Sequence, residues 1–386
     1  MNAKMIVSIV STYSTKCGIS FYTRSLARGL VAAGVDVQII AENVWRKNSV
    51  NFPFVVLKAI INRRSDVVHI QHEYLLFGRG EYNLLLLPLL LLLRLLRIPC
   101  LITMHSVISR SLLSRKFFSE YTRSSRFLVV KRTGVIILTT FLACLSKLII
   151  VHTRKAKEIL CNEYFVRSPT IYVIPHGSET HYPIQEKRPR EKKHRTVLFF
   201  GFVKPSKGVH TLIRSIALIS GEYPDLRLLI VGECPIGQGT SPIYIQELRQ
   251  LANELAINDK VEFLDRYISD EESLRLIGMA DIIVLPYEDE VEGESGVLKK
   301  VCPFGKPVIA SDVGKFREVL SDGEDGLLFK RGDEGTLAAA MIKLLSDCAL
   351  ADRLGKNLKK LAARHSWHKV AAQTISLYKM TMKFES

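Results

Sequence analysis

Short apolar runs rich in β-branched residues alternate with helical patterns along the whole chain. In the first half such runs predict strands at 5–10, 35–41, 66–71, 100–105, 147–153 and 171–177. In the second half they predict strands at 196–201, 226–232, 260–265, 281–287, 306–312 and 326–329. Amphipathic segments between them, such as 21–34 and 208–223, predict helices. Strands that alternate with helices are typical of α/β folds with doubly wound parallel sheets.

A polar, charged segment that contains prolines, 182–196, interrupts this alternation near the middle of the chain. A length of 386 residues is enough for two domains, each with its own core. We therefore expect a Rossmann-like domain over 1–190, a second one over 191–365, and a terminal amphipathic helix over 366–386.

Two stretches are apolar enough to raise the question of a membrane span, namely 84–104 and 134–153. A span needs about 20 consecutive apolar residues. Arg94 interrupts the first stretch, and Lys147 splits the second. The favoured interpretation of both is a buried helix followed by a strand. The first residues lack the charged segment and long apolar core of a signal peptide, so they predict a first strand.

Charge is distributed unevenly along the chain, whose formal net charge is +16. Residues 1–190 hold 27 Lys and Arg against 10 Asp and Glu, whereas 191–386 hold 27 against 28. A basic half can attract nucleic acid, an anionic membrane or an acidic substrate, or it can simply aid solubility. Zinc-finger spacing, RNA-recognition aromatics and a clean basic helix are missing, which argues against nucleic acid. An anionic cytoplasmic leaflet or a phospholipid-linked substrate fits better.

The seven cysteines are scattered and form no CxxC pair. This pattern favours a reducing compartment over a disulfide framework or a zinc site.

Ligands of doubly wound sheets bind beyond the carboxyl ends of the strands, so the loops there are candidate sites. Gly18 opens the helix after the first strand and lets the backbone approach a ligand, although a plain turn is equally compatible. In the second half a strand ends at Gly201, and Lys204 and Lys207 precede a helix that starts at Gly208. Two ammonium groups beside a helix start predict a phosphate clamp; a solvated lysine loop is the alternative.

The segment "EVEGESGVLKKVCPFGKPVIAS" repeats this design with an acidic loop in front of the helix. The N–H groups of Gly296 and Val297 would favour an anion such as phosphate. The carboxylates of Glu292 and Glu294 would repel phosphate, so we expect them to address neutral hydroxyls, as on a sugar.

Together these motifs resemble the family-4 retaining glycosyltransferases (glycosyl transferases group 1), which have the two-domain GT-B fold. The matching stretches are "CGISFYTRSL", "TMHS", "VIPHG", "FFGFVKPSKGVHTLI", "IVGE", "ADIIVLPYEDEVEGESGVLKKVCPFGKPVIASDVGKFREVLSDGEDGLLF" and "HSWHKVAAQTISLY". The resemblance implies a nucleotide-diphosphate sugar, GDP- or UDP-linked, held as a substrate by the second domain. It implies a glycan or lipid-linked acceptor on the first, a cleft between the domains, retention of configuration, no metal and no separate cofactor. It also implies that the last helix packs back on the first domain.

The resemblance also suggests roles for single residues. His105 and Glu292 would lie near the donor sugar, and Lys207, with Lys204, would hold the diphosphate. The remaining expected donor contacts are Gly18, Gly201, Gly208, Gly232, Glu233, Tyr267, Glu294, Ser295, Gly296, Val297 and Lys300.

Two positions depart from the family pattern. The second glutamate of its Glu–seven residues–Glu motif, which usually addresses the ribose, is replaced by Lys300, and an expected arginine is Phe202. Either the ribose is recognised differently, or Lys300 adds a phosphate contact, or the site is degraded. A working hexosyltransferase of cell-envelope polysaccharide or glycolipid synthesis, peripheral on the cytoplasmic membrane face, is the favoured interpretation. A weakened scaffold that binds sugar nucleotide or membrane, or a GT-B epimerase or phosphorylase, are the alternatives.

One further cluster, "HIQHEY", brings His69, His72 and Glu73 close together in sequence. A metal site is conceivable, but His69 and Glu73 alternate unfavourably on a strand. A structural or acceptor-side role is favoured.

Overall fold

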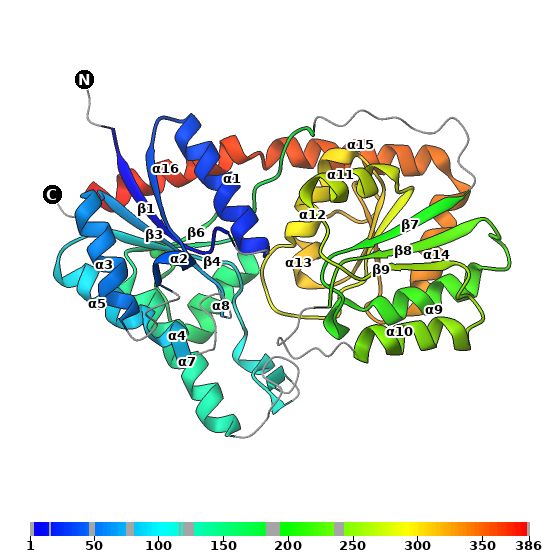
Figure 1. The fold of residues 1–386 in the computed structure, drawn as a ribbon, viewed down its shortest axis with the longest axis horizontal. Helices are drawn as coiled ribbons and strands as arrows, with labels where there is room; N and C mark the ends of the chain where they lie inside the picture. The colour runs from blue at the N-terminus through cyan, green and yellow to red at the C-terminus, as the bar shows by residue number, and fades with distance from the viewer. Residues whose placement is uncertain are drawn as a thin grey trace.

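The structure, a computed structural model, describes residues 4–14, 17–45, 51–74, 81–115, 117–118, 127–182, 194–234 and 243–383. Two parallel six-stranded sheets, one in each half of the chain, form the centres of two domains (Figure 1). The α/β class and the two Rossmann-like sheets predicted from the sequence are confirmed. The predicted domain boundary near residue 190 lies outside the described residues.

The sheet of the first domain has the strand order β2-β1-β3-β4-β5-β6. Its strands are β1 (Ile6–Val10), β2 (Asp36–Ile40), β3 (Val67–His72), β4 (Cys100–Met104), β5 (Leu148–Val151) and β6 (Ile171–Val173). The sheet of the second domain has the order β12-β11-β10-β7-β8-β9. Its strands are β7 (Arg195–Phe200), β8 (Leu226–Val231), β9 (Val261–Leu264), β10 (Ile282–Leu285), β11 (Val308–Ser311) and β12 (Leu327–Phe329). All twelve predicted strands are confirmed.

Helices cover both faces of the first sheet. Two of them, α1 (Gly18–Ala32) and α16 (Trp367–Lys383), share one core with that sheet. The other face carries α3 (Phe52–Arg63), α5 (Leu86–Leu95), α7 (Leu128–Leu145) and α8 (Arg154–Tyr164). Shorter helices are α2 (Glu42–Trp45), α4 (Glu81–Leu84), η1 (Arg110–Leu112) and η2 (Ser168–Thr170). The sheet is therefore buried on both sides, as a parallel sheet must be.

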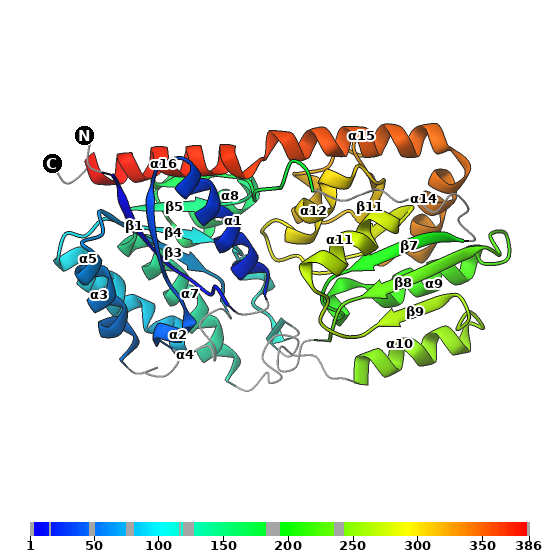
Figure 2. The same cartoon turned by 45° about the horizontal axis from the view of Figure 1, so that its top comes forward.

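The second sheet is also sandwiched, with α15 and α10 on opposite sides of it (Figure 2). Its longer helices are α9 (Val209–Ile219), α10 (Ile243–Glu254), α11 (Asp270–Met279), α14 (Glu334–Ser346) and α15 (Cys348–Arg364). Short helices lie in the connections between the strands: η3 (Pro205–Lys207), α12 (Gly296–Val301), η4 (Cys302–Phe304) and α13 (Gly314–Arg317).

The two apolar stretches each form a helix followed by a strand, but α7, the helix of the second stretch, is less buried than predicted. In α7 only Leu138, Thr139, Leu142 and Ala143 are buried. The prediction of a buried helix is therefore wrong for α7, because its apolar side chains are not confined to the face that meets the core, and Val129, Val130 and Phe141 are exposed. Among the described helices, α7 alone is long and apolar enough to cross a membrane, and 22% of it is buried.

The chain crosses between the domains a second time after α15, and α16 then packs on the first domain. A β-carbon added at Gly29 of α1 would lie 3.0 Å from the β-carbon of Ala371 in α16, so the two helices approach closely at small residues. Beside this crossing, Ser178 donates its N–H to the carbonyl of His365, and Trp367 donates its N–H to the carbonyl of Ser178. Two segments that belong to different crossings are thus paired.

Candidate active site

Strand order places the candidate site where ligands bind in doubly wound sheets. In the second domain β7 lies beside β10, and the strand order reverses between them. In the first domain the reversal falls between β1 and β3. The crevice at such a switch point, beyond the carboxyl ends of the strands, is the usual ligand position. The loops after β7, β10, β1 and β3 are therefore the first places to look.

Two glycines allow the loops of the second domain to pack tightly at this point. Gly208 has φ +63°, and a β-carbon there would lie 1.9 Å from the carbonyl oxygen of Pro286. Gly232 has φ +137°, and a β-carbon there would lie 2.1 Å from the carbonyl oxygen of Gly201. Only glycine combines these backbone angles with such close contact. These two predicted donor residues thus bring the loops after β7, β8 and β10 together.

Three lysines converge on one carboxylate at the switch point of the second domain. Lys207 Nζ lies 3.8 Å from Asp289 Oδ2, and Lys315 Nζ is hydrogen-bonded to Asp289 Oδ1. Lys204, at the start of the same loop as Lys207, contributes a third positive charge to Asp289. Lys207 Nζ also lies 3.3 Å from the centroid of the Tyr287 ring, a cation–π contact. We call Lys204, Lys207, Lys315 and Asp289 the lysine cluster.

The lysine cluster carries more positive than negative charge in a poorly solvated place. Burial lowers the pKa of Lys207 well below its usual value, and Asp289 offsets this only in part. Burial likewise lowers the pKa of Lys204. Burial opposes ionisation of Asp289, but Lys315 and Lys207 outweigh it and lower the pKa of that carboxyl. An anionic ligand would supply the missing negative charge.

His105, at the end of β4, holds a defined orientation on the first domain's side. Its Nε2 lies 2.9 Å from Oε1 of Gln71, and its Nδ1 lies 3.1 Å from Nε2 of His152. His152 Nδ1 in turn lies 2.9 Å from the carbonyl oxygen of Ile174. Burial, and then the neighbouring histidines, lower the pKa of His105 well below its usual value. The Tyr22 ring meets the His105 ring edge-on, with centroids 4.6 Å apart.

The end of β4 contacts the acidic loop of the second domain directly. Val107 and Glu292 exchange two backbone hydrogen bonds, of 2.9 Å and 3.2 Å. A β-carbon at Gly293, where φ is +156°, would lie 2.4 Å from the carbonyl oxygen of His105. His105 and the acidic loop, far apart in sequence, are therefore neighbours in space.

Glu73, after β3, also lies at this junction. It accepts a hydrogen bond of 2.6 Å from Ser106 Oγ and one of 2.9 Å from the N–H of Tyr74. Burial raises the pKa of Glu73, and Lys204 and Lys315 counteract part of that rise. One carboxylate of the first domain thus faces the lysine cluster of the second.

The side chain of Glu292 lies against the start of α13. A β-carbon at Gly314 would lie 2.3 Å from Glu292 Oε1, so glycine is needed there to admit the carboxylate. Glu292 Oε2 is buried and has no hydrogen-bond partner. Burial, and then Glu318, raise the pKa of Glu292. This leaves one carboxylate oxygen able to accept a hydrogen bond from a ligand hydroxyl.

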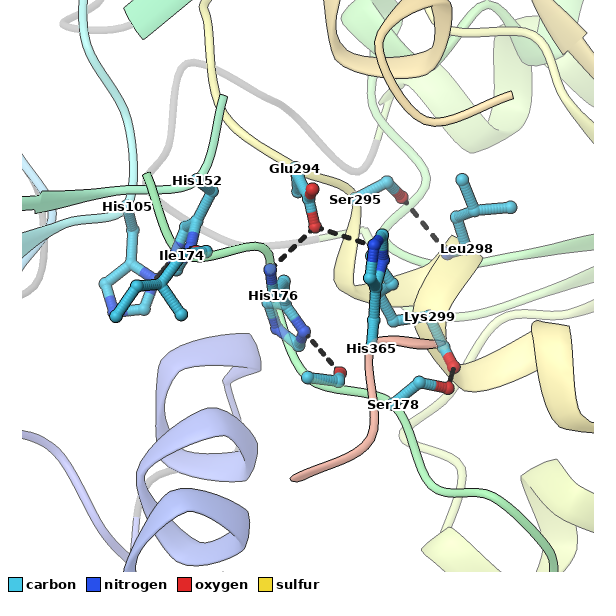
Figure 3. A network of polar contacts seen from close by, with 11 residues as sticks. His105, His152, Ile174, His176, Ser178, Glu294, Ser295, Leu298, Lys299 and His365 are labelled. Carbon is cyan, nitrogen blue, oxygen red and sulfur yellow. Dashed lines mark hydrogen bonds and ion pairs between the residues drawn. The ribbon is translucent and has the colours of Figure 1, made fainter. Parts of the chain in front are cut away.

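Glu294 lies elsewhere, in a buried network at the crossing between the domains (Figure 3). Its Oε2 accepts from the backbone N–H of His176 at 2.8 Å and lies 3.1 Å from Lys299 Nζ. Lys299 Nζ donates to His365 Nδ1 at 2.7 Å, and Ser178 Oγ donates to the Lys299 carbonyl. We call Glu294, Lys299, His176, His365 and Ser178 the crossing network.

Ser295 and Lys300 take other positions around the same helix. Ser295 caps α12, because its Oγ accepts the N–H of Leu298 at 3.2 Å. Lys300 Nζ pairs with Asp270 Oδ1 at 3.0 Å and lies 5.4 Å from the centroid of the Phe200 ring. Lys300 therefore already has a carboxylate partner.

The remaining predicted donor residues lie around these loops. Val297 packs near Gly201, Gly296 lies near the His176 ring, and the Glu233 carbonyl accepts the N–H of Val203. Tyr267 is 43% exposed, and Gly18 opens α1 with open space beside it.

Sequence reasoning missed Lys315, Asp289, Gln71, His152 and Lys299. Lys315 and Asp289 each follow a strand of the second sheet, so their position at strand ends was an available signal. Gln71 and His152 also end predicted strands of the first half. Nothing local distinguishes Lys299 from Lys300, because the difference lies in the direction that each side chain takes from the short helix α12.

The "HIQHEY" residues do not converge on one point. His69 bonds Tyr378 and Thr103, both at 2.7 Å, whereas Glu73 bonds Ser106. Within the described ranges, no group of three or more His, Cys, Asp or Glu side chains could hold a metal ion.

Known proteins share both the sequence pattern and the fold. The family model for glycosyl transferases group 1 matches residues 183–361, and that for glycosyltransferase family 4 matches residues 17–182. A D-inositol 3-phosphate glycosyltransferase of Corynebacterium glutamicum is 30% identical over 240 residues, which are 59% of this chain and 56% of the relative. A phosphatidyl-myo-inositol mannosyltransferase of Mycolicibacterium smegmatis is 32% identical over 212 residues, 53% of this chain and 50% of the relative. The chain spans about half the length of the curated relatives it matches.

Solved structures agree on the fold. HepE of Anabaena, crystallised with UDP and glucose, superimposes with a TM-score of 0.73 at 16% identity, covering 97% of this chain and 100% of that one. The sucrose-phosphate synthase of Thermosynechococcus elongatus gives 0.74 at 20% identity, covering 98% and 99%. The fold is GT-B. With both halves matched by its two family models, the chain belongs to the family-4, group-1 glycosyltransferases.

Proposed function

We propose that this protein transfers a hexose from a nucleotide-diphosphate sugar, GDP- or UDP-linked, to a hydroxyl of a glycan or lipid-linked acceptor. The observation that carries the proposal is the lysine cluster at the switch point of the second domain. Its ammonium groups outnumber its carboxylate, and the two lysines of the β7 loop are costly to keep charged without an anion. A donor diphosphate has the charge and the size to complete it.

The two domains supply different parts of the reaction. The lysine cluster would stabilise the charge that develops on the leaving diphosphate, which lowers the barrier rather than only tightening binding. Glu292 Oε2 would accept a hydrogen bond from a sugar hydroxyl. Neutral His105, whose two ring nitrogens are already paired with Gln71 and His152, would lie beside the sugar and help to shape its pocket. The acceptor hydroxyl would attack from the leaving-group face and pass its proton to the departing phosphate, so configuration is retained.

Charge and the relatives support our proposal for the chemical class of the acceptor. Two similar proteins are named for action on D-inositol 3-phosphate and phosphatidyl-myo-inositol. The first half of this chain, which carries the excess positive charge, suits an anionic or phospholipid-linked acceptor of the cell envelope. We place the protein on the cytoplasmic face of the membrane as a peripheral enzyme that needs no metal.

The first test is nucleotide release from a panel of UDP-, GDP- and ADP-sugars, with and without phosphatidylinositol as acceptor. One donor should be turned over, and Lys207→Ala should lower the rate about a hundredfold while the protein stays folded. Addition of EDTA should not change the rate, and the product linkage should keep the donor's anomeric configuration by NMR. Binding of nucleotide without any turnover would favour a scaffold instead.

A further inference from the structure

A second basic region lies in the first domain, at the end of its sheet opposite to the candidate active site. A pocket of about 800 Å³ opens beside the amino ends of β4 and β5, where Cys100 and Leu148 begin those strands. His105 and His152 lie at the other ends of the same strands. The pocket is therefore separated from the candidate active site by the length of the sheet.

Four cations line this pocket: Arg94, Arg97, Lys147 and Arg167. No Asp or Glu is among the described residues that line it. Arg94 also donates a hydrogen bond of 3.3 Å to the carbonyl of Cys144, which joins α5 to the end of α7. Backbone and hydroxyl groups of the lining, such as Ser146 and Thr170, add polar contacts. The pocket is suited to an anionic group the size of a lipid headgroup.

Exposed apolar side chains belong to this pocket's lining or lie within a few residues of lining residues along the chain. Phe165, part of its lining, is 78% exposed, and Leu95, between Arg94 and Arg97 in the chain, is 70% exposed. Leu96 is 51% exposed and Phe141 of α7 is 50% exposed. We call this surface, with the four cations, the basic corner.

The helix layer that contains α5 and α7 also combines basic and apolar residues without carboxylates. The helices α3, α5 and α7 contain five Lys or Arg and no Asp or Glu. Their outer sides expose Phe54, Ile61, Leu91 and Ile137. In Figure 1 these three helices lie together on the side of the sheet away from α16. Apolar side chains without carboxylates, beside a cationic pocket, form a surface that both charge and solvation favour at an anionic bilayer.

We propose that the basic corner binds the headgroup phosphate of an anionic membrane lipid while Leu95, Phe141 and Phe165 enter the bilayer interface. The proposal rests on the peripheral-membrane part of the proposed function and names the surface responsible. A soluble anion would gain nothing from the apolar rim. A second copy of this chain would bring a like-charged face against the first, which disfavours self-association.

The test is co-sedimentation of the full chain with vesicles of phosphatidylcholine, with or without phosphatidylglycerol. The wild-type protein should prefer the anionic vesicles. The variant R97Q/R167Q should lose about thirtyfold in affinity, on the order of 2 kcal/mol for two cations. The variant R353Q/K356Q removes two exposed cations from α15 of the second domain and should bind like the wild type. Arg94 is left in place because it bonds Cys144.

Further measurements distinguish a membrane lipid from other ligands of the basic corner. The variant L95S/F141S should weaken vesicle binding but leave nucleotide release unchanged, since neither residue is near the donor loops. Inorganic phosphate is added as a competitor of vesicle binding. If phosphate abolishes the binding that depends on Arg97 and Arg167, and if L95S/F141S binds vesicles as well as the wild type does, the site is one for a free anion. That result would overturn the lipid assignment. A wild-type dimer that L95S/F141S dissociates in sedimentation velocity would also overturn it.

The two levels of the proposal fail in different ways. If the wild type binds no vesicles, the peripheral-membrane function fails. If the wild type binds and R97Q/R167Q binds equally well, only the basic corner is wrong.

Discussion

Among the lysine–carboxylate contacts of the second domain, Lys207 with Asp289 and Lys299 with Glu294 have opposite designs. The Lys299–Glu294 pair is sealed, with side chains 2% and 3% exposed, and its charges balance. Lys207 is 17% exposed, and Asp289 is shared with Lys204 and Lys315. The first contact is complete without a ligand, whereas the second leaves positive charge in excess. A lysine near a carboxylate thus indicates a binding site only when the local charges do not cancel.

The same comparison applies to Lys299 and Lys300, two neighbouring lysines of α12 that have different partners. Lys299 turns into the crossing between the domains, where it joins segments from three parts of the chain. Lys300 turns the other way, to Asp270 and the Phe200 ring. Neither is drawn into the lysine cluster. The sequence-based idea that Lys300 adds a phosphate contact therefore stays a prediction, and one that its existing partner weakens.

The largest expected effect is the loss of folding stability when the Lys299–Glu294 pair is broken. Lys299→Met leaves the Glu294 carboxylate buried without its cation, and such losses cost about 3–5 kcal/mol. Urea denaturation should show this loss in stability. The double variant E294Q/K299M, which removes both charges, should recover much of it. Equal stability of Lys299→Met and the wild type would show that the pair is not sealed as the structure has it.

The next largest effect is a loss of affinity for the donor nucleotide on removal of Lys315, a residue that was not predicted from the sequence. Lys315→Ala should raise the Kd for the donor nucleotide about tenfold, roughly 1.4 kcal/mol, because it removes one cation of the cluster. Calorimetric titration measures this. Lys330→Ala is the matched control, since Lys330 is 78% exposed and pairs only locally with Asp333. A similar loss in both variants would mean that general charge, and not the cluster, matters.

The charge excess also predicts a pH dependence. The pKa of Lys207 is lowered in the free protein, mainly by burial, and a bound diphosphate would raise it. Binding therefore takes up a proton, and affinity falls as pH rises above the lowered pKa of the free protein. Titrations in buffers of different ionisation enthalpy would detect the uptake. In Lys207→Met this uptake should shrink, whereas in Lys299→Met it should persist; an unchanged uptake in Lys207→Met contradicts the assignment.

The smallest expected effect is that of Lys300→Ala. Because Asp270 already neutralises this lysine, donor affinity should change by about twofold or less, within the range of exposed pairs. A loss as large as that of Lys315→Ala would place Lys300 at the donor phosphates after all.

Much of the fold could be read from local sequence. The twelve strands and the glycine-led loops follow from apolar periodicity and from backbone angles that only glycine adopts easily, and both are properties of neighbouring residues. The lysines of the β7 loop were found for the same reason: they lie directly after a strand. The helix over Leu128–Leu145 shows the limit, because apolar composition predicted burial but only 22% of the helix is buried in the fold.

The chain itself determined two doubly wound domains, a cationic loop after β7 and an excess of positive charge in the first half. Only the tertiary structure decided which carboxylate each lysine meets. Lys315 approaches Asp289 from another strand end, and Glu294 meets His176 and Lys299 beside His365, across separations of up to 118 residues. Coulomb interactions depend on distance in space and on burial, and neither is set by sequence spacing. The same residue types therefore form a charge-balanced, buried network in one place and a cluster with excess positive charge in another.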